Sequence, residues 1–280
     1  MNIISEYNKF TILGPPMRAY FFTLLFSLFC LISFSQPYDA KSNSLAGIGT
    51  AESSVWSNFT NQAGLADINK FTIGAGSENS FGIKELSTHT AVFALPVNGG
   101  VFGLNVAYTG FELYNESKIG LAFSKKLSDN FNLGIQVDYL GVYVDEGSNN
   151  HNNFTFEIGA QKRLMRNLTL GAHIFNPIEV KLNEKENIPS IFKLGLRYDA
   201  NQKVAVFTEG ELESNQDAKL KIGLEYKIIK QMQLRTGFST NPSQNTFGIG
   251  YTLNNIQFDI AVKRHQILGY SPQFSVSSSF

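Results

Sequence analysis

The stretch FKLGLRYD, residues 192–199, alternates between apolar side chains and polar or glycine residues. The same period of two recurs in LKIGLEYK (220–227), FGIGYTL (247–253) and IQFDIAVK (256–263). Successive side chains of a β-strand point to opposite faces of a sheet, so each stretch would have one apolar and one polar face. In an amphipathic helix the apolar residues would instead recur every three or four positions.

The alternation continues from residue 70 to the end of the chain and predicts fourteen strands. They lie near 70–78, 87–96, 100–111, 117–126, 131–145, 153–163, 167–176, 189–199, 202–213, 218–228, 232–240, 245–253, 255–264 and 271–280. Short connections fall near Asn98, Asp129, Arg166, Asn201, Lys230 and Asn254, and longer ones at 79–86, 112–116, 146–152, 177–188, 214–217, 241–244 and 265–270. Short turns on one rim, longer loops on the other and an even number of strands are typical of outer-membrane barrels. We therefore predict an all-β fold, a transmembrane antiparallel β-barrel over residues 70–280.

A soluble β-sandwich would show a similar alternation and is the competing prediction. Aromatic residues such as Tyr198 and Tyr226 stand on the apolar faces, where a membrane barrel places them at the level of the lipid headgroups. The chain also ends on an aromatic residue in an alternating strand, with Phe274, Val276 and Phe280 in the same parity. We predict that these three residues form the signal read by the outer-membrane barrel assembly machinery.

Composition excludes several other classes of protein. The 280 residues include 23 Lys and Arg against 23 Asp and Glu, so a basic face for nucleic acid is not expected. A single Cys excludes a disulfide framework and a thiolate metal site. The four His residues, at 89, 151, 173 and 265, lack metal-ligand spacing. Because neither His173 nor His265 has an obvious catalytic partner, we predict no cofactor, no metal and no enzymatic activity.

The first 35 residues are predicted to be a secretory signal peptide. Residues 19–34 are almost entirely apolar, Arg18 precedes them, and small residues precede a cleavage site after Ser35. The apolar run is short for a membrane helix, which makes a retained anchor the less favoured reading. Met17 is an alternative start of the chain.

Residues 36–69, here called the hatch segment, do not alternate. They contain SLAGIGTA (44–51) and WSNFTNQAGLA (56–66), with the only Trp of the chain. These stretches are similar to the N-terminal signature of FadL-like outer-membrane barrels and of the PorV/PorQ proteins of Bacteroidota. The motif residues are Gly47, Gly49, Trp56, Phe59, Asn61, Ala63, Gly64 and Leu65. The sequence departs from the signature at Gln62, where Pro is usual, and at Thr50-Ala51.

The resemblance implies that the hatch segment folds inside the barrel. It also implies a non-enzymatic protein of the outer membrane of a Gram-negative bacterium, with Bacteroidota as its expected source. The short chain and brief loops favour a PorV/PorQ-like accessory of type IX secretion, with secreted proteins or secretion components as partners. The alternative is a FadL-like passive transporter, whose partner is a small hydrophobic molecule. Outer-membrane lipid is a partner in either case.

The polar face of the predicted strands would line the lumen. Its candidate residues are Gly195, Gly223, Glu225, Arg235, Gly248 and Asp259. Opposite charges on neighbouring strands are expected to pair across the sheet. The repeated glycines have two readings: they relieve crowding as the barrel closes, or they admit the close approach of a segment in the lumen. We expect Trp56, Phe59 and Leu65 to pack against Gly195, Gly223 and Gly248.

Overall fold

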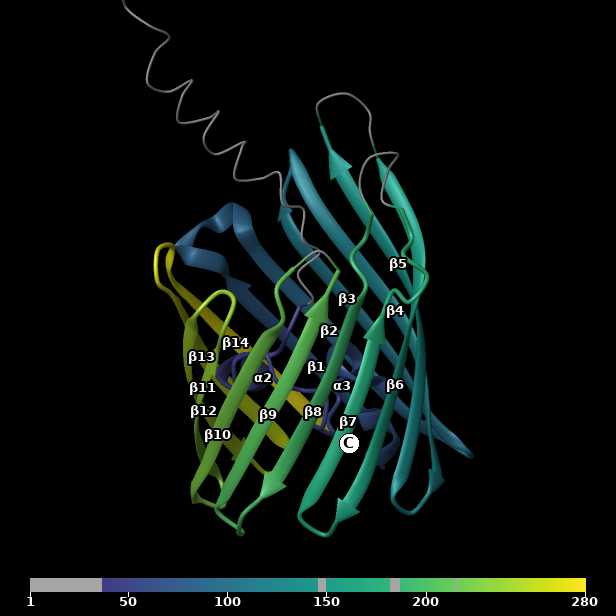
Figure 1. Cartoon of the computed structure of the whole chain (residues 1–280), viewed down its shortest axis with the longest axis vertical. Helices are drawn as coiled ribbons and strands as arrows, with labels where there is room; N and C mark the ends of the chain where they lie inside the picture. The colour runs from purple at the N-terminus through teal and green to yellow at the C-terminus, as the bar shows by residue number, and fades with distance from the viewer. Residues whose placement is uncertain (1–36, 146–149, 182–186, 215) are drawn as a thin grey trace, which may run out of the picture. The chain divides into compact units, whose positions relative to one another are not determined.

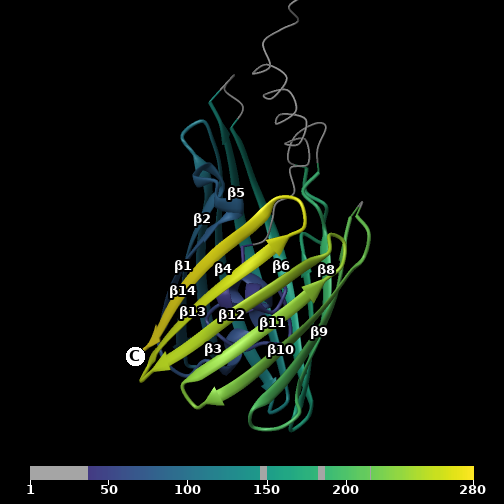
Figure 2. The ribbon, with the colours of Figure 1, turned by 90° about the vertical axis from the view of Figure 1, so that its left-hand side faces the viewer.

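The computed structural model describes residues 37–145, 150–181, 187–214 and 216–280. The predicted signal peptide, residues 1–35, lies outside the described residues. Fourteen antiparallel strands form a closed barrel in which each strand pairs with its neighbours in the sequence and β1 pairs with β14 (Figures 1 and 2). The predicted fold class is therefore confirmed. No helix within the described ranges is long and apolar enough to cross a membrane.

The strand bounds lie close to those predicted from the alternation. They are β1 Thr72–Asn79, β2 Ser87–Val97, β3 Gly100–Phe111, β4 Tyr114–Ser128, β5 Phe131–Val144, β6 His151–Met165, β7 Leu168–Phe175, β8 Ile191–Asp199, β9 Val204–Glu213, β10 Lys219–Ile229, β11 Met232–Ser239, β12 Gln244–Leu253, β13 Ile256–His265 and β14 Gly269–Ser279. One predicted loop is wrong. Residues 112–116 are not a longer connection, because β3 and β4 pair up to Phe111 and Tyr114 and leave only a tight turn.

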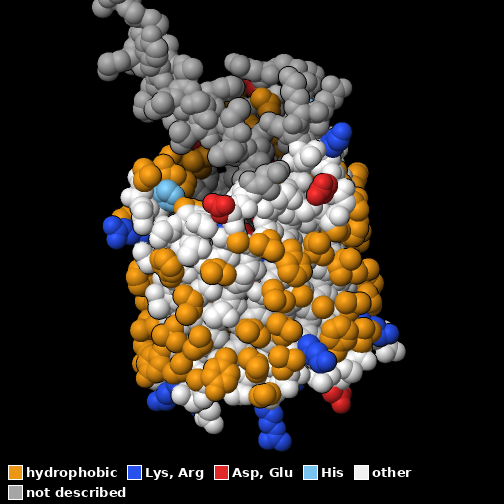
Figure 3. All heavy atoms as spheres, viewed as in Figure 1, with side chains coloured by type: hydrophobic (Ala, Val, Ile, Leu, Met, Phe, Trp, Pro, Cys, Tyr) orange, Lys and Arg blue, Asp and Glu red, His pale blue; other side chains and the backbone are white. Residues whose placement is uncertain are grey.

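The parity of the strands follows the predicted two-faced pattern. On β8, Phe192, Leu194 and Leu196 are exposed on the outer surface, whereas Lys193 and Gly195 between them are buried. Apolar side chains cover much of the outer face between two polar rims (Figure 3). Lipid hydrocarbon offers no partner to polar groups, so this apolar band is the surface that a membrane barrel requires.

Short helices make up the described part of the hatch segment and lie within the ring of strands (Figure 1). They are α2 Ala40–Ser44, α3 Ser57–Thr60 and the 3-10 helix η1 Gln62–Asp67. Two further 3-10 turns, η2 Ser80–Gly82 and η3 Lys84–Leu86, lie in the connection between β1 and β2. Leu45, Phe59 and Leu65 are almost fully buried, although their segment belongs to no sheet.

Candidate functional site

Local side-chain caps stabilise the irregular backbone of the hatch segment. Asp39 precedes α2, and its carboxylate accepts hydrogen bonds from the backbone N–H groups of Lys41 and Ser42. Asn61 does the same for η1 by accepting from the N–H of Ala63. Gly47 follows α2 with φ +75°, a conformation that glycine adopts without strain. The sequence thus favours short turns here rather than an extra strand.

One side of the hatch segment is apolar. Val55, Trp56, Phe59 and Leu65 form a buried cluster with small apolar residues of the inner wall. Those wall residues are Val92 and Ala94 on β2, Val101 and Ala107 on β3, and Ala122 on β4. Burying an apolar side chain of this size contributes about 1.5–3 kcal/mol, so the cluster anchors this side of the segment.

The expected packing of Trp56, Phe59 and Leu65 against Gly195, Gly223 and Gly248 is wrong. A Cβ placed on Gly195 would meet Thr50, one on Gly223 would meet Leu45, and one on Gly248 would meet Ser44. The larger residues instead face β2–β4, where the inner wall presents the larger set of apolar side chains, while Leu45 and Ile48 pack against a smaller apolar cluster on β9. The inner face is therefore not uniformly polar, because apolar residues of β2–β4 also have inward parity.

The opposite side of the hatch segment is held by hydrogen bonds. The carboxylate of Glu209 accepts from the backbone N–H groups of Gly49 (3.2 Å) and Thr50 (3.1 Å). The amide of Gln161 donates to the carbonyl groups of Thr50 (3.0 Å) and Glu52 (2.8 Å). These side chains come from β9 and β6, far apart in the sequence. They satisfy backbone groups of the hatch segment that no sheet or helix pairs.

Asn61 is the motif residue with the widest reach. Its side-chain amide donates to the carbonyl of Thr50 (2.7 Å) and lies close to the carbonyls of Ala160 (3.1 Å) and Ala172 (3.3 Å) on β6 and β7. Glycine in the adjacent inward position of β6 makes this approach possible, since a Cβ on Gly159 would lie 2.0 Å from the Asn61 side-chain oxygen. Asn61 therefore ties two turns of the hatch segment to the barrel wall.

The inner-wall glycines admit close approach of the hatch segment. A Cβ added to Gly171 would lie 2.0 Å from the Thr50 carbonyl oxygen, and one added to Gly134 would lie 2.5 Å from the Gln62 backbone. Gly248 is similarly close to Ser44, at 2.4 Å. Of the two readings of these glycines, the structure supports close approach at these positions. Gly250 is different, because its space is taken by the wall side chains of Arg235 and Asp259.

The other glycines of the motif act within the hatch segment itself. A Cβ on Gly49 would lie 2.5 Å from the Thr60 side chain, and a Cβ on Gly64 would lie 2.3 Å from the Glu52 carbonyl oxygen. Ala63 is fully buried, and its carbonyl accepts a hydrogen bond from Ser124 on β4. The motif residues therefore lie together in one compact unit.

Charged residues fill the lumen between the hatch segment and the short-turn ends of the strands. Arg235 on β11 donates to Glu225 on the neighbouring strand β10 (2.7 Å), as expected, and also to Asp259 two strands away on β13 (2.5 Å). Glu52 in the hatch segment pairs with Lys41 and with Arg197 on β8 (2.6 Å for the latter). The sequence does not point to Glu52 as a site residue. Its partner Arg197 is 145 residues away, and its partner Lys41 lies in the hatch segment, outside the alternating strands.

The burial of acidic groups in the hatch segment shifts their pKa values in opposite directions. Burial alone would raise the pKa of Glu52, but the charges of Lys41 and Arg197 outweigh it and lower that pKa to about 2. Burial raises the pKa of Asp39 to about 6, although Ser42 donates to its carboxylate. Glu52 is therefore ionised in the structure at neutral pH. Ionisation of Asp39 lowers the stability of the folded protein.

A cavity of about 590 Å³ lies next to this charged region. Its lining combines Trp56 and Ile68 of the hatch segment with Arg197, Lys227 and Gln233 of the wall. The hatch side of the cavity is mixed, because Lys41, Ser54 and Asn69 also line it, and the wall side is polar. It separates the hatch segment from the ends of the strands at the short-turn rim.

A second buried polar network lies on the other side of the hatch segment. Glu157 on β6 accepts from Lys118 (2.5 Å), from Gln62 of the hatch segment (2.6 Å) and is paired with His173 (2.7 Å). His173, for which the sequence offered no obvious catalytic partner, thus pairs with a buried carboxylate of the neighbouring strand. Gln62 stands where the signature usually has Pro. Its side-chain amide donates to Glu157, a hydrogen bond that a proline could not make.

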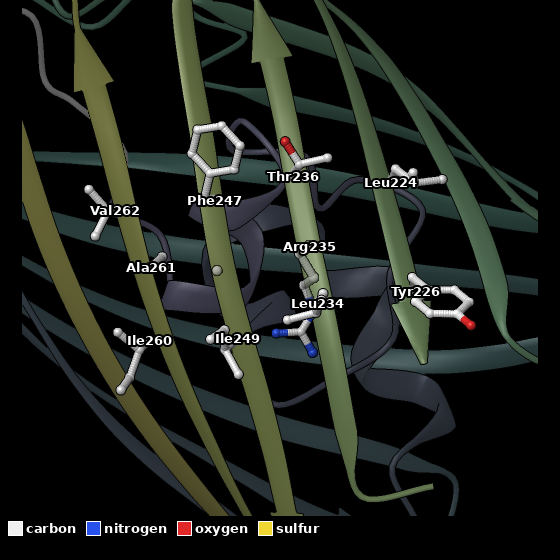
Figure 4. A pocket seen from close by; sticks show the side chains of 11 residues that line it. Leu224, Tyr226, Leu234, Arg235, Thr236, Phe247, Ile249, Ile260, Ala261 and Val262 are labelled. Carbon is white, nitrogen blue, oxygen red and sulfur yellow. The ribbon is translucent and has the colours of Figure 1, made fainter. Parts of the chain in front are cut away.

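The outer wall carries an apolar groove of about 470 Å³ over β10–β13 (Figure 4). Leu224, Phe247, Ile249 and Ile260 flank it. Gly248 forms part of its floor, and Ser44 of the hatch segment lies directly behind that glycine. The wall is therefore thin at this position.

The C-terminal residues close the ring of strands. On β14, Phe274 and Val276 pair with Ser77 and Ala75 of β1. The N–H of Phe280 donates to the carbonyl of Phe71 (2.9 Å), and the two rings lie 6.1 Å apart. Recognition of this end by the assembly machinery stays a prediction.

Comparisons with known proteins support the fold. No family model and no curated protein matches the sequence. The solved structure of the CymD monoaromatic hydrocarbon channel is similar, with a TM-score of 0.70 and 10% identity over 89% of this chain and 99% of that one. The toluene transporter TodX of P. putida gives a TM-score of 0.66 and 14% identity over 88% and 99% of the two chains. A FadL homologue of Pseudomonas aeruginosa gives 0.63 and 13% over 87% and 98%.

At these identities the likeness shows the fold alone. The chain therefore has the architecture of FadL-type outer-membrane barrels, with fourteen strands closed around an N-terminal segment. The similar proteins CymD and TodX are a monoaromatic hydrocarbon channel and a toluene transporter.

Proposed function

We propose that this protein is an outer-membrane channel through which a small hydrophobic compound crosses by passive diffusion, and that the hatch segment closes its lumen. The observation that carries the proposal is the apolar contact between Trp56, Phe59 and Leu65 and the inner wall of β2–β4. This apolar seam is the larger of two apolar contacts between the hatch segment and a wall that also carries many polar and ion-paired groups. A compound without polar groups can replace these contacts and leave no hydrogen-bonding group unpaired.

The PorV/PorQ-like role in type IX secretion is the less favoured proposal. It rests on the resemblance of the hatch motif, as does the expected origin in Bacteroidota. The similar solved structures are hydrocarbon channels, which supports transport of a hydrophobic compound. We retain capture of a secreted protein only as an outcome of the test below.

Uptake of radiolabelled toluene by a Gram-negative host that lacks its own hydrophobic channels tests the proposal. We expect faster uptake in cells that carry the barrel than in cells with an empty vector, and no gain for a sugar of similar size. A variant with Gly103→Leu should reduce the uptake, because a side chain there would collide with Asn58 and Leu65 in the apolar seam.

Gly210→Ala is the matched control, since its Cβ would meet only Leu220 at 4.0 Å. Barrel insertion is measured in parallel for each variant by heat-modifiable gel mobility. Equal toluene uptake with and without inserted barrel, together with recovery of a secreted protein on the barrel, would favour the secretion role instead.

A further inference from the structure

The two rims of the barrel carry different charges. Exposed basic residues gather at the short-turn rim, at the ends of β4, β6, β8–β9 and β10. They are Lys125, Lys162, Arg163, Arg166, Lys203 and Lys230. None of these six has an ion pair with another described residue. Lys and Arg side chains also mark the lower edge of the face shown in Figure 3.

Acidic residues do not neutralise this rim. Of the acids nearby, Asp67 pairs with Lys126 (2.9 Å) and lies within electrostatic range of Arg163, and Asp199 pairs with Arg197 (2.9 Å). Asp129 is exposed in the β4–β5 turn, so the basic residues of this rim outnumber the acids. The long-loop rim differs, because its exposed Lys84, Lys181 and Arg264 stand among exposed acids. Those acids include Glu85, Glu112, Asp145, Glu179 and Asp217.

Apolar residues alternate with the basic ones at the short-turn rim. Leu127, Leu164 and Met165 are about half exposed there, next in sequence to the basic residues of β4 and β6. Long basic side chains that keep their stems on apolar surface and their charges in water are typical of a membrane interface. A soluble acidic partner would not require the exposed apolar residues, so the pattern favours lipid.

We propose that this basic rim binds the phosphate-bearing headgroups of anionic phospholipids in the leaflet beside the short turns. Anionic lipid attracts basic residues near the surface with about 1 kcal/mol for each Lys or Arg, and the attraction decays within a Debye length. The basic rim would thus fix the depth of the barrel and its orientation in the bilayer. This inference does not depend on what the barrel transports.

The test uses the full-length barrel, purified in a zwitterionic detergent and mixed with equal amounts of phosphatidylglycerol and phosphatidylcholine. Native mass spectrometry counts the retained molecules of each lipid. We expect a preference for phosphatidylglycerol that falls at least about tenfold in the triple variant K125Q/K162Q/R166Q and falls similarly in 0.5 M salt.

The matched control K84Q/K181Q/R264Q removes as many charges from the long-loop rim and should keep the preference. An equal loss in the two triple variants would overturn the proposal, because net charge rather than the basic rim would then govern binding. Loss of both lipids alike in the first variant would also overturn it. Heat-modifiable mobility shows that each variant is folded.

Discussion

On the side of β2–β4, the hatch segment meets the barrel mainly through Trp56, Phe59 and Leu65. On the side of β6–β9 it does so through hydrogen bonds from Gln161 and to Glu209, together with a smaller apolar cluster against β9. Apolar contacts have little directionality, so the first side can separate and pack again at modest cost. Hydrogen bonds to buried backbone groups are directional, and breaking one leaves an unpaired group. Under the proposed function, a hydrophobic compound would displace the apolar side while the hydrogen bonds of the other side keep the hatch segment in place.

Removing the hatch segment, and with it both its apolar and its hydrogen-bonded contacts to the wall, has the largest expected effect. Deletion of residues 37–66 should convert a barrel of negligible conductance into an open pore, because the lumen wall is polar and would fill with water. Single-channel recording in planar bilayers measures the change. A deleted barrel that inserts and still does not conduct would show that the hatch segment is not what closes the lumen.

The apolar side is tested by Phe59→Ala. Phe59 is 1% exposed, and truncating a fully buried Phe typically costs about 3–5 kcal/mol. The matched control is Phe247→Ala, where the same truncation removes a ring that is 59% exposed on the outer face. Reversible denaturant unfolding in lipid vesicles measures both, and equal costs would mean that the cluster does not anchor the hatch segment.

The polar side is tested by Gly171→Ala. The added methyl group would lie 2.0 Å from the Thr50 carbonyl oxygen, so the hatch segment must shift away from Gln161. We expect a loss of about 1–3 kcal/mol, as for other overpacked sites. Gly210→Ala, whose Cβ has space, should lie within about 1 kcal/mol of the parent protein. Similar unfolding midpoints for the two variants would contradict the close approach.

The smallest expected effects are changes in the pH dependence of stability. The pKa of Glu52 is lowered to about 2 in the folded protein, so its contribution is present above pH 4.5 and is lost as the pH falls toward 2. The pKa of Asp39 is raised to about 6, so stability is lost as the pH rises from 3.8 to 6. Thermal unfolding between pH 2 and 7 measures both effects. The Glu52→Gln variant should lack the loss of stability below pH 4.5, and the Asp39→Asn variant should lack the loss between pH 3.8 and 6. Parent-like profiles for both variants would rule out these two groups.

The strands could be predicted from the sequence because lipid and water lie on opposite sides of each one. That contrast gives residues such as Leu194 and Gly195 an unmistakable period of two. The contacts of the hatch segment could not be predicted, because they depend on which strands face each other across the lumen. Gln161 and Thr50 are 111 residues apart, and nothing local in the sequence relates them. One signal was present in the sequence: Ala94 and Ala122 are apolar residues at inward positions of their strands, where they form part of the wall that contacts Trp56, Phe59 and Leu65.

The hatch segment contacts β14, the strand that closes the barrel against β1. The backbone N–H of Ala40 donates to Ser275 on β14, 235 residues further along the chain (3.2 Å). Such contacts between the ends of a chain carry the largest loop-closure entropy and are expected to form late. We therefore expect α2 to dock on β14 at about the stage at which β14 pairs with β1. Docking of the hatch segment and closure of the barrel are thus coupled, because each brings together the two ends of the chain that the other requires.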